Sequence, residues 1–126
     1  MNVSSRRLAD VVVVAPVGPV DHFAAQQLQS ELAPVLDEAS ATKAALVFDL
    51  SEVDYISSMG LRVLMVAAKQ IRARNARIAA ASLQPVVEEI FDIARFKHVL
   101  EVFPSVRAAL QAMSDPALAA YDAIAR

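Results

Sequence analysis

The chain has 126 residues, 56% of them hydrophobic, a length and composition typical of one domain around a single core. With 12 Lys and Arg against 14 Asp and Glu, the formal charge is -2, so the basic surface of a nucleic-acid-binding protein is not expected. The chain has no cysteine and only two histidines, which excludes disulfides and thiolate chemistry and argues against a metal or other cofactor.

The first segments predict a β-hairpin in a protein without a membrane span. The run Val11–Val17 is apolar but too short to cross a bilayer, and no small-residue cleavage site follows it, so we expect a cytoplasmic protein without direct membrane insertion. The same run is rich in β-branched residues, which predicts a strand, and Asn2–Leu8 alternates weakly, as a pairing strand would. A turn near Ala9 and Asp10 would join them.

The next segments predict a helix and a buried strand. The turn Gly18-Pro19-Val20-Asp21 ends on a good N-cap residue, and a helix should follow to about Asp37. Its predicted apolar stripe consists of Phe23, Leu28, Leu32, Val35 and Leu36. Lys43–Leu50 is almost continuously apolar, which is typical of a strand covered on both faces, so it should be the central strand of a largely parallel sheet.

After a connection over Ser51–Tyr55, helices and strands continue to alternate. A second helix should end near Asn75 and bury Leu61, Leu64, Met65, Ala68 and Ile71. The later predicted elements are a strand at Arg77–Ser82, a helix at Gln84–Ala94 with Val86, Val87, Ile90 and Phe91 inward, a strand at Val99–Phe103 and a helix at Ser105–Met113. This order predicts an α/β fold with one mixed sheet of about five strands and about four helices packed on it.

Two interpretations remain open for the end of the chain. We expect the domain to cover residues 1–113 and the segment 114–126 to be a tail or a short helix. Asp115 is a good N-cap and Pro116 suits the first helical position, which favours a helix through Arg126. The apolar residues there are mostly alanine with little to bury, which favours fraying instead. The oligomeric state is equally open.

Two adjacent serines, Ser57 and Ser58, lie where a buried strand gives way to a turn and then a helix. The first turn of a helix has free N–H groups and a partial positive charge, so it stabilises a side-chain oxygen and, more so, a phosphate. Phosphorylation would add a charge of about -1.5 to -2, which opposes binding in an interface near apolar Ile56, Met59 and Leu61. The residues alone favour the simpler interpretation, in which one serine is a plain N-cap.

The segment Val47–Leu64 resembles the signature of STAS-domain anti-sigma factor antagonists. It reads Val-Phe-Asp-Leu-Ser-Glu-Val-Asp-Tyr-Ile-Ser-Ser-Met-Gly-Leu-Arg-Val-Leu. The family reads, loosely, apolar-Asp-Leu-Ser/Thr-x-apolar-x-aromatic-apolar-Asp-Ser-Ser/Thr-Gly-Leu. The turn Gly18–Asp21 also matches the family's Gly-x-apolar-Asp, and the resemblance spans about residues 8–112. It implies a STAS-type domain that is a regulator and not an enzyme.

The resemblance also implies a partner-switching mechanism. The unphosphorylated antagonist would bind an anti-sigma factor that is also a serine kinase, and phosphorylation would release it. A metal-dependent serine phosphatase would restore the active form. The matching phosphoacceptor is Ser58, with Ser57 as the alternative. Together, the residues and the resemblance predict a partner-binding surface formed by Asp21, Ile56, Ser57, Met59, Gly60 and Arg62.

Three residues depart from the family pattern. Ser57 replaces the usual acidic residue, Met59 replaces the small residue before the glycine, and Arg95 stands where glycine often follows the third helix. Glycine is favoured at such a position because it adopts the left-handed conformation without steric cost. The loop at Ala94–Phe96 is therefore expected to differ from the family.

Several side chains allow more than one role. Asp21 either caps the first helix or helps to orient the kinase partner and its magnesium nucleotide. Arg62, one turn after Ser58, is either solvated or pairs with a phosphoserine or an acidic partner. His22 is adjacent to Asp21, but no cysteine or suitably spaced second histidine accompanies it, and two glycines cannot form a glycine-rich phosphate loop. We therefore predict no catalytic residue and no metal site.

The alternative function is a standalone STAS subunit of a membrane lipid or anion transporter. In that case the start of the second helix would contact an ATPase or a permease. The sequence identifies neither the sigma factor, the kinase, the phosphatase nor the physiological output.

Overall fold

A computed structural model describes residues 1–124 of the chain. Its strands are β1 (Asn2–Leu8), β2 (Val11–Val17), β3 (Ala45–Asp49), β4 (Ile78–Ala81) and β5 (Glu101–Phe103). Its helices are α1 (His22–Thr42), α2 (Ser58–Arg72), α3 (Pro85–Ile93), α4 (Val106–Met113) and α5 (Asp115–Ile124), with the short 3₁₀-helix η1 (Phe96–His98). The predicted order of strands and helices is confirmed over this range.

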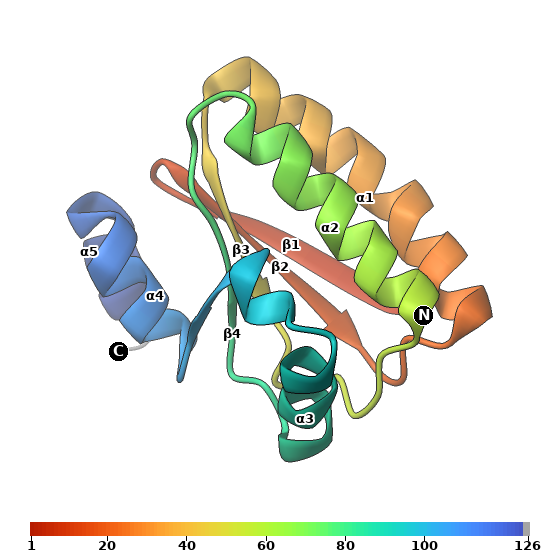
Figure 1. The fold of residues 1–126 in the computed structure, drawn as a ribbon. Coiled ribbons are helices and arrows are strands. Elements are labelled where there is room, and N and C mark those ends of the chain that lie inside the picture. The colour runs from red at the N-terminus through yellow and green to blue at the C-terminus, as the bar shows by residue number, and fades with distance from the viewer. Residues whose placement is uncertain (125–126) are drawn as a thin grey trace.

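The five strands form one mixed sheet in the order β1-β2-β3-β4-β5. β1 and β2 are an antiparallel hairpin in which Leu8 pairs with Val11, whereas the other neighbours are parallel. Parallel neighbours require crossover helices, and successive crossovers of the same hand place α1 and α2 side by side on one face (Figure 1). The α/β fold and the central position of the third strand are confirmed.

Helices cover both faces of the sheet (Figure 1). On one face α1, α2 and α3 pack over the strand residues Val12, Val14, Leu46, Phe48, Ile78 and Ala80. On the other face α4 and α5 pack over Leu8, Val11, Val13, Val47 and Ala81. Because successive residues of a strand point to opposite faces, a sheet covered on both sides requires apolar residues at every position. This explains the continuous apolar run in β3.

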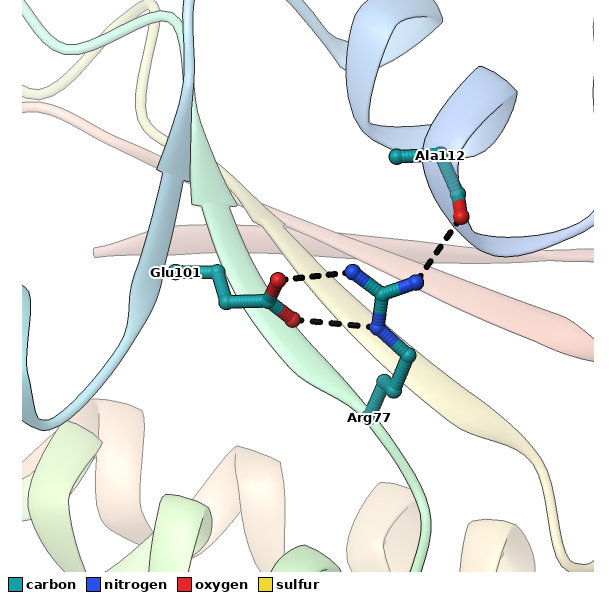
Figure 2. A network of polar contacts seen from close by, with 3 residues as sticks. All are labelled: Arg77, Glu101 and Ala112. Atoms are coloured by element: carbon teal, nitrogen blue, oxygen red, sulfur yellow. Dashed lines mark hydrogen bonds and ion pairs between the residues drawn. The ribbon is translucent and has the colours of Figure 1, made fainter.

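A polar network joins the amino end of β4 to β5 and α4 (Figure 2). Arg77 donates two hydrogen bonds to the carboxylate of Glu101, at 2.6 and 3.1 Å, and a third to the carbonyl of Ala112 at 2.8 Å. The hydrogen bond to Glu101 raises the pKa of the Arg77 guanidinium above its ordinary value. The network thereby fixes the last turn of α4 against the edge of the sheet.

The end of the chain is a docked helix within the described residues. Ala117 of α5 is fully buried and belongs to the core beneath α4. Ser114 donates a hydrogen bond to Asp10 at the hairpin turn, and Arg107 of α4 forms a two-point ion pair with Asp122 at 3.1 Å. These contacts favour docking over fraying. Residues 125 and 126, the last of the predicted helix, lie outside the described residues.

Two side chains predicted to be buried are exposed instead. Phe23 is 77% exposed and Val86 is 50% exposed. Both lie in the first turn of their helices, where Ala25 and Val87 are the fully buried residues, so Phe23 and Val86 are on the side of the turn that faces solvent. The expected inward position was therefore wrong for both residues. α1 also continues past its predicted end near Asp37, and its Pro34 lies inside the helix.

Within residues 1–124 no helix combines the length and the apolar content that a membrane crossing requires. In the same part of the chain, no group of three or more His, Asp or Glu side chains is arranged to hold a metal ion.

Candidate functional site

The loops that follow β2 and β3 are joined at the carboxyl edge of the sheet. The amide of Val20 donates to the carbonyl of Tyr55 at 2.8 Å, and the amide of Ser57 donates to the carbonyl of Val20 at 2.8 Å. Val20 and Ile56 form an isolated parallel bridge between the loops. The two loops therefore form one surface although they are far apart in the sequence.

Each loop ends in a side chain that caps the helix after it. Asp21 accepts a hydrogen bond from the amide of Ala24 at 2.8 Å at the start of α1. Ser57 accepts one from the amide of Gly60 at 3.1 Å at the start of α2. An N-cap side chain satisfies one of the free N–H groups of the first turn, so both residues fix where their helices begin.

The capping role at α2 belongs to Ser57 and not to Ser58. Ser57 is half-buried with its hydroxyl in the cap, whereas Ser58 is the first residue of the helix and is exposed. No side-chain hydrogen bond within the described residues involves the Ser58 hydroxyl. The sequence left open which of the two serines caps α2, and the structure shows that it is Ser57.

Gly60 allows α2 to begin close against the joined loops. A Cβ atom at this position would lie 2.7 Å from Cγ1 of Ile56 and 2.8 Å from Cγ1 of Val20, closer than atoms can pack. Gly60 is buried, and Ile56 is only 2% exposed. The expected direct contact of Ile56 and Gly60 with a partner therefore needs correction, because both residues shape the site from inside the core.

The other predicted partner residues lie at or near the surface. Asp21, Ser58 and Arg62 are exposed, and Ser57 and Met59 are half-buried. Arg62 lies one turn after Ser58 on the same face of α2, as expected. The site thus offers an acceptor hydroxyl at a helix start, a carboxylate and a guanidinium.

The sequence did not reveal a groove between α1 and α2 that opens beside Met59. Its lining residues are Gln29, Leu32, Ala33, Leu36, Asp37, Met59, Arg62, Val63, Val66, Ala67 and Gln70. One sequence signal existed, because Val66 interrupts the polar face that Arg62 and Lys69 form on α2. Val66 is 41% exposed, so it is an apolar side chain without full cover in the described structure.

The fold and the joined loops define a small α/β domain that presents two capped helix starts at one edge of a mixed sheet. The chain belongs to the STAS domain family, which it matches over residues 2–109. A proposed anti-sigma factor antagonist of Bordetella bronchiseptica, BtrV, is 34% identical to it over 112 residues, covering 89% of this chain and 94% of the relative. The resemblance seen in the Val47–Leu64 segment is confirmed.

Solved structures of several proteins share this fold. An anti-sigma factor antagonist from Mycobacterium paratuberculosis has a TM-score of 0.80 at 22% identity, covering 90% of this chain and 94% of its own. The phosphorylated form of the Bacillus cell fate determinant SpoIIAA has a TM-score of 0.65 at 13% identity, covering 88% and 98%. The murine anion transporter Slc26a9 has a TM-score of 0.68 at 19% identity, covering 84% of this chain and 18% of the transporter. These likenesses show the STAS fold.

Proposed function

We propose that this chain is an anti-sigma factor antagonist that acts by partner switching. The unphosphorylated chain binds an anti-sigma factor that is also a serine kinase, and this binding frees the sigma factor. Phosphorylation releases the kinase, and a metal-dependent serine phosphatase restores the binding form. The chain is the substrate of both enzymes and not itself a catalyst. Because sigma factors act on RNA polymerase, we place the chain in the cytoplasm.

The observation that carries this proposal is the difference between the two serines at the start of α2. The Ser58 hydroxyl is exposed, so a kinase can reach it without disturbing the helix. The Ser57 hydroxyl accepts the amide of Gly60, and a phosphate there would have to share or displace the cap. We therefore assign the phosphate to Ser58. The identity to the Bordetella relative supports the general role.

Phosphate at Ser58 changes the partner's binding more than it changes the fold. At a helix amino terminus a negative charge is worth roughly 0.3–1 kcal/mol in favour of the helix. In an interface, a charge of about -2 without a matching group costs several kcal/mol. A cost of about 3 kcal/mol corresponds to a rise in Kd on the order of 100-fold, so the contact is broken without refolding.

The partner surface that we propose consists of the exposed and half-buried residues around Ser58. Asp21, Ser57, Met59 and Arg62 contact the kinase directly. Asp21 can cap α1 with one carboxylate oxygen and present the other to the partner.

Phosphate mapping tests the site assignment. The full chain is used to purify its anti-sigma factor kinase, and the two are incubated with ATP before mass spectrometry. We expect one phosphate, on Ser58, that is absent from Ser58→Ala and present in Ser57→Ala. Phosphate on Ser57 would move the acceptor by one residue, and no phosphate from a kinase that is active on another substrate would overturn the proposal.

Binding measurements test the switch itself. Ser58→Asp should raise the Kd for the kinase by at least tenfold, whereas Ser58→Ala should bind as the unmodified chain does. Ser30→Asp provides a matched control, because Ser30 is exposed on α1 and the substitution adds the same charge away from the site. Equal affinity of Ser58→Asp and Ser58→Ala would contradict partner switching.

The second candidate function is a standalone STAS subunit of a membrane lipid or anion transporter. The fold likeness to one part of the murine anion transporter motivates it. Co-purification of the full chain with membrane-associated subunits, and with no kinase, would favour this candidate.

A further inference from the structure

We propose that the groove between α1 and α2 receives an amphipathic helix of the anti-sigma factor kinase, and that phosphorylation of Ser58 weakens this contact through Arg62. The inference rests on the proposed function and names the surface that would hold the partner. The groove has an apolar floor formed by Leu32, Leu36, Val63 and Ala67. Its rim is lined by the polar residues Gln29, Asp37, Arg62 and Gln70.

The groove has the length of a short helix. α1 and α2 lie side by side and run in the same direction (Figure 1). Residues of both helices line the groove, so it runs along their axes. Its lining on α2 extends from Met59 to Gln70, which at 1.5 Å per residue is about 16 Å. This length suits roughly three helical turns, whose apolar residues at i, i+3 or i+4, and i+7 would enter the groove.

Two charges on the rim set the charge pattern of the bound helix. Arg62 lies at the end next to Ser58, and Asp37 comes from α1, beyond Leu36. Both side chains are exposed, and neither belongs to an ion pair among residues 1–124. The complementary helix carries an acidic residue opposite Arg62 and a basic residue opposite Asp37.

Met59 connects the groove with the proposed phosphorylation site. It lines the groove and directly follows Ser58 in the sequence. Methionine is flexible and polarizable, and such side chains are common where a surface must adapt to a partner. Met59 therefore makes the surface around Ser58 continuous with the groove, so one partner can contact both.

Arg62 connects the groove with the switch. It lies four residues after Ser58, the spacing at which oppositely charged side chains pair on one helix face. A phosphate on Ser58 would attract the Arg62 guanidinium within the chain and compete with the acidic residue of the bound helix. Phosphorylation then acts in two ways, by adding charge at Ser58 and by removing the basic contact of the groove.

Substitutions in the groove test the binding surface. Ala33→Arg and Val66→Arg each place a long charged side chain in the groove at positions that are exposed enough to accept it. We expect each to weaken binding of the purified kinase at least tenfold. Ala41→Arg on α1 and Ala73→Arg at the C-cap of α2 are the controls, because both positions are exposed and outside the groove, and they should bind normally. Urea unfolding of all four variants excludes loss of the fold as the cause.

The outcomes separate this inference from the proposed function. If Ala33→Arg and Val66→Arg bind like the controls while Ser58→Asp still releases the kinase, the groove inference is overturned and partner switching stands. If no anti-sigma factor kinase binds the full chain, both fail. If groove substitutions change the sedimentation coefficient of the free chain and leave kinase binding intact, the groove holds a second copy of this chain and the inference is wrong.

Arg62 has its own test. Arg62→Gln should weaken binding of the unphosphorylated chain several-fold and should reduce the additional effect of phosphorylating Ser58. Lys69→Gln removes the same charge from an exposed position of α2 outside the groove lining, and it should change neither quantity. An unchanged phosphorylation effect in Arg62→Gln would show that Arg62 takes no part in the switch. A photo-crosslinker at position 33 should label one amphipathic helical segment of the kinase.

Discussion

The Ser57 hydroxyl lies 3.1 Å from the amide nitrogen of Gly60 and accepts its hydrogen bond, while the neighbouring Ser58 remains exposed. Two chemically identical side chains, adjacent in the sequence, thus have different tasks at one helix start. The first fixes the position of α2, and the second is free for modification.

Ser57→Ala should lower the free energy of unfolding by about 1 kcal/mol, because it removes the N-cap of α2. Ser58→Ala should change it by less than about 0.5 kcal/mol, as expected for an exposed side chain outside any such feature. Urea unfolding followed by circular dichroism compares the two. Equal losses would show that the cap is not specific to Ser57.

Gly60→Ala should destabilise the chain by roughly 1–3 kcal/mol, because the added Cβ clashes with Ile56 and Val20. The sign is diagnostic, since alanine in place of glycine inside a helix normally stabilises by up to about 1 kcal/mol. In an Ile56→Ala background the same substitution should cost less, because one clashing side chain is gone. Additive losses in the double variant would contradict the clash.

Arg95→Gly should be more stable than Arg95→Ala by about 1 kcal/mol. Arg95 has φ 55, a left-handed conformation that costs a residue with a Cβ roughly 1–2 kcal/mol, partly offset by the greater flexibility of glycine in the unfolded chain. The alanine variant separates the effect of backbone conformation from loss of the charge. Thermal unfolding measures the difference, and equal melting temperatures would show that the left-handed position carries no cost.

The pair of Arg77 and Glu101 should contribute about 0.5–1 kcal/mol, measured as the coupling in a double-mutant cycle with Arg77→Met and Glu101→Gln. Both side chains are 44% exposed, so solvent screens the pair despite its two-point geometry. The coupling should fall in 1 M NaCl. A coupling above about 2 kcal/mol that is independent of salt would contradict this account.

A chain that ends at Met113 should fold cooperatively and lose roughly 1–3 kcal/mol, which tests our proposal that residues 1–113 are the domain. The truncation removes buried Ala117 and the partners of Asp10 and Arg107. Asp122→Asn removes only the exposed ion pair and should cost less than about 1 kcal/mol. Loss of a cooperative transition on truncation would make α5 part of the domain.

Sequence periodicity predicted the order of strands and helices because each strand and helix buries one or two continuous apolar faces. It did not predict the exposure of Phe23, because the smaller Ala25, and not Phe23, is the residue that the first turn of α1 buries. The N-cap at Ser57 could not be chosen over Ser58 from residue type, because the choice depends on where the loop after β3 meets Val20.

The groove was missed for a related reason. Leu32, Leu36 and Val63 have the spacing of core residues, and they are buried. Whether a groove remains open above these residues depends only on the position of α1 relative to α2. That position is set by contacts along the whole length of both helices.

The bridge between Val20 and Ile56 makes the surface around Ser58 a discontinuous epitope. A peptide with the sequence from Val53 to Leu61 carries Ser58, the proposed phosphoacceptor, but lacks the half that the first loop supplies. Under the proposed function, a kinase that contacts both halves would recognise the chain only after the two loops have come together. An unfolded copy would therefore be a poor substrate, although its sequence around Ser58 is the same.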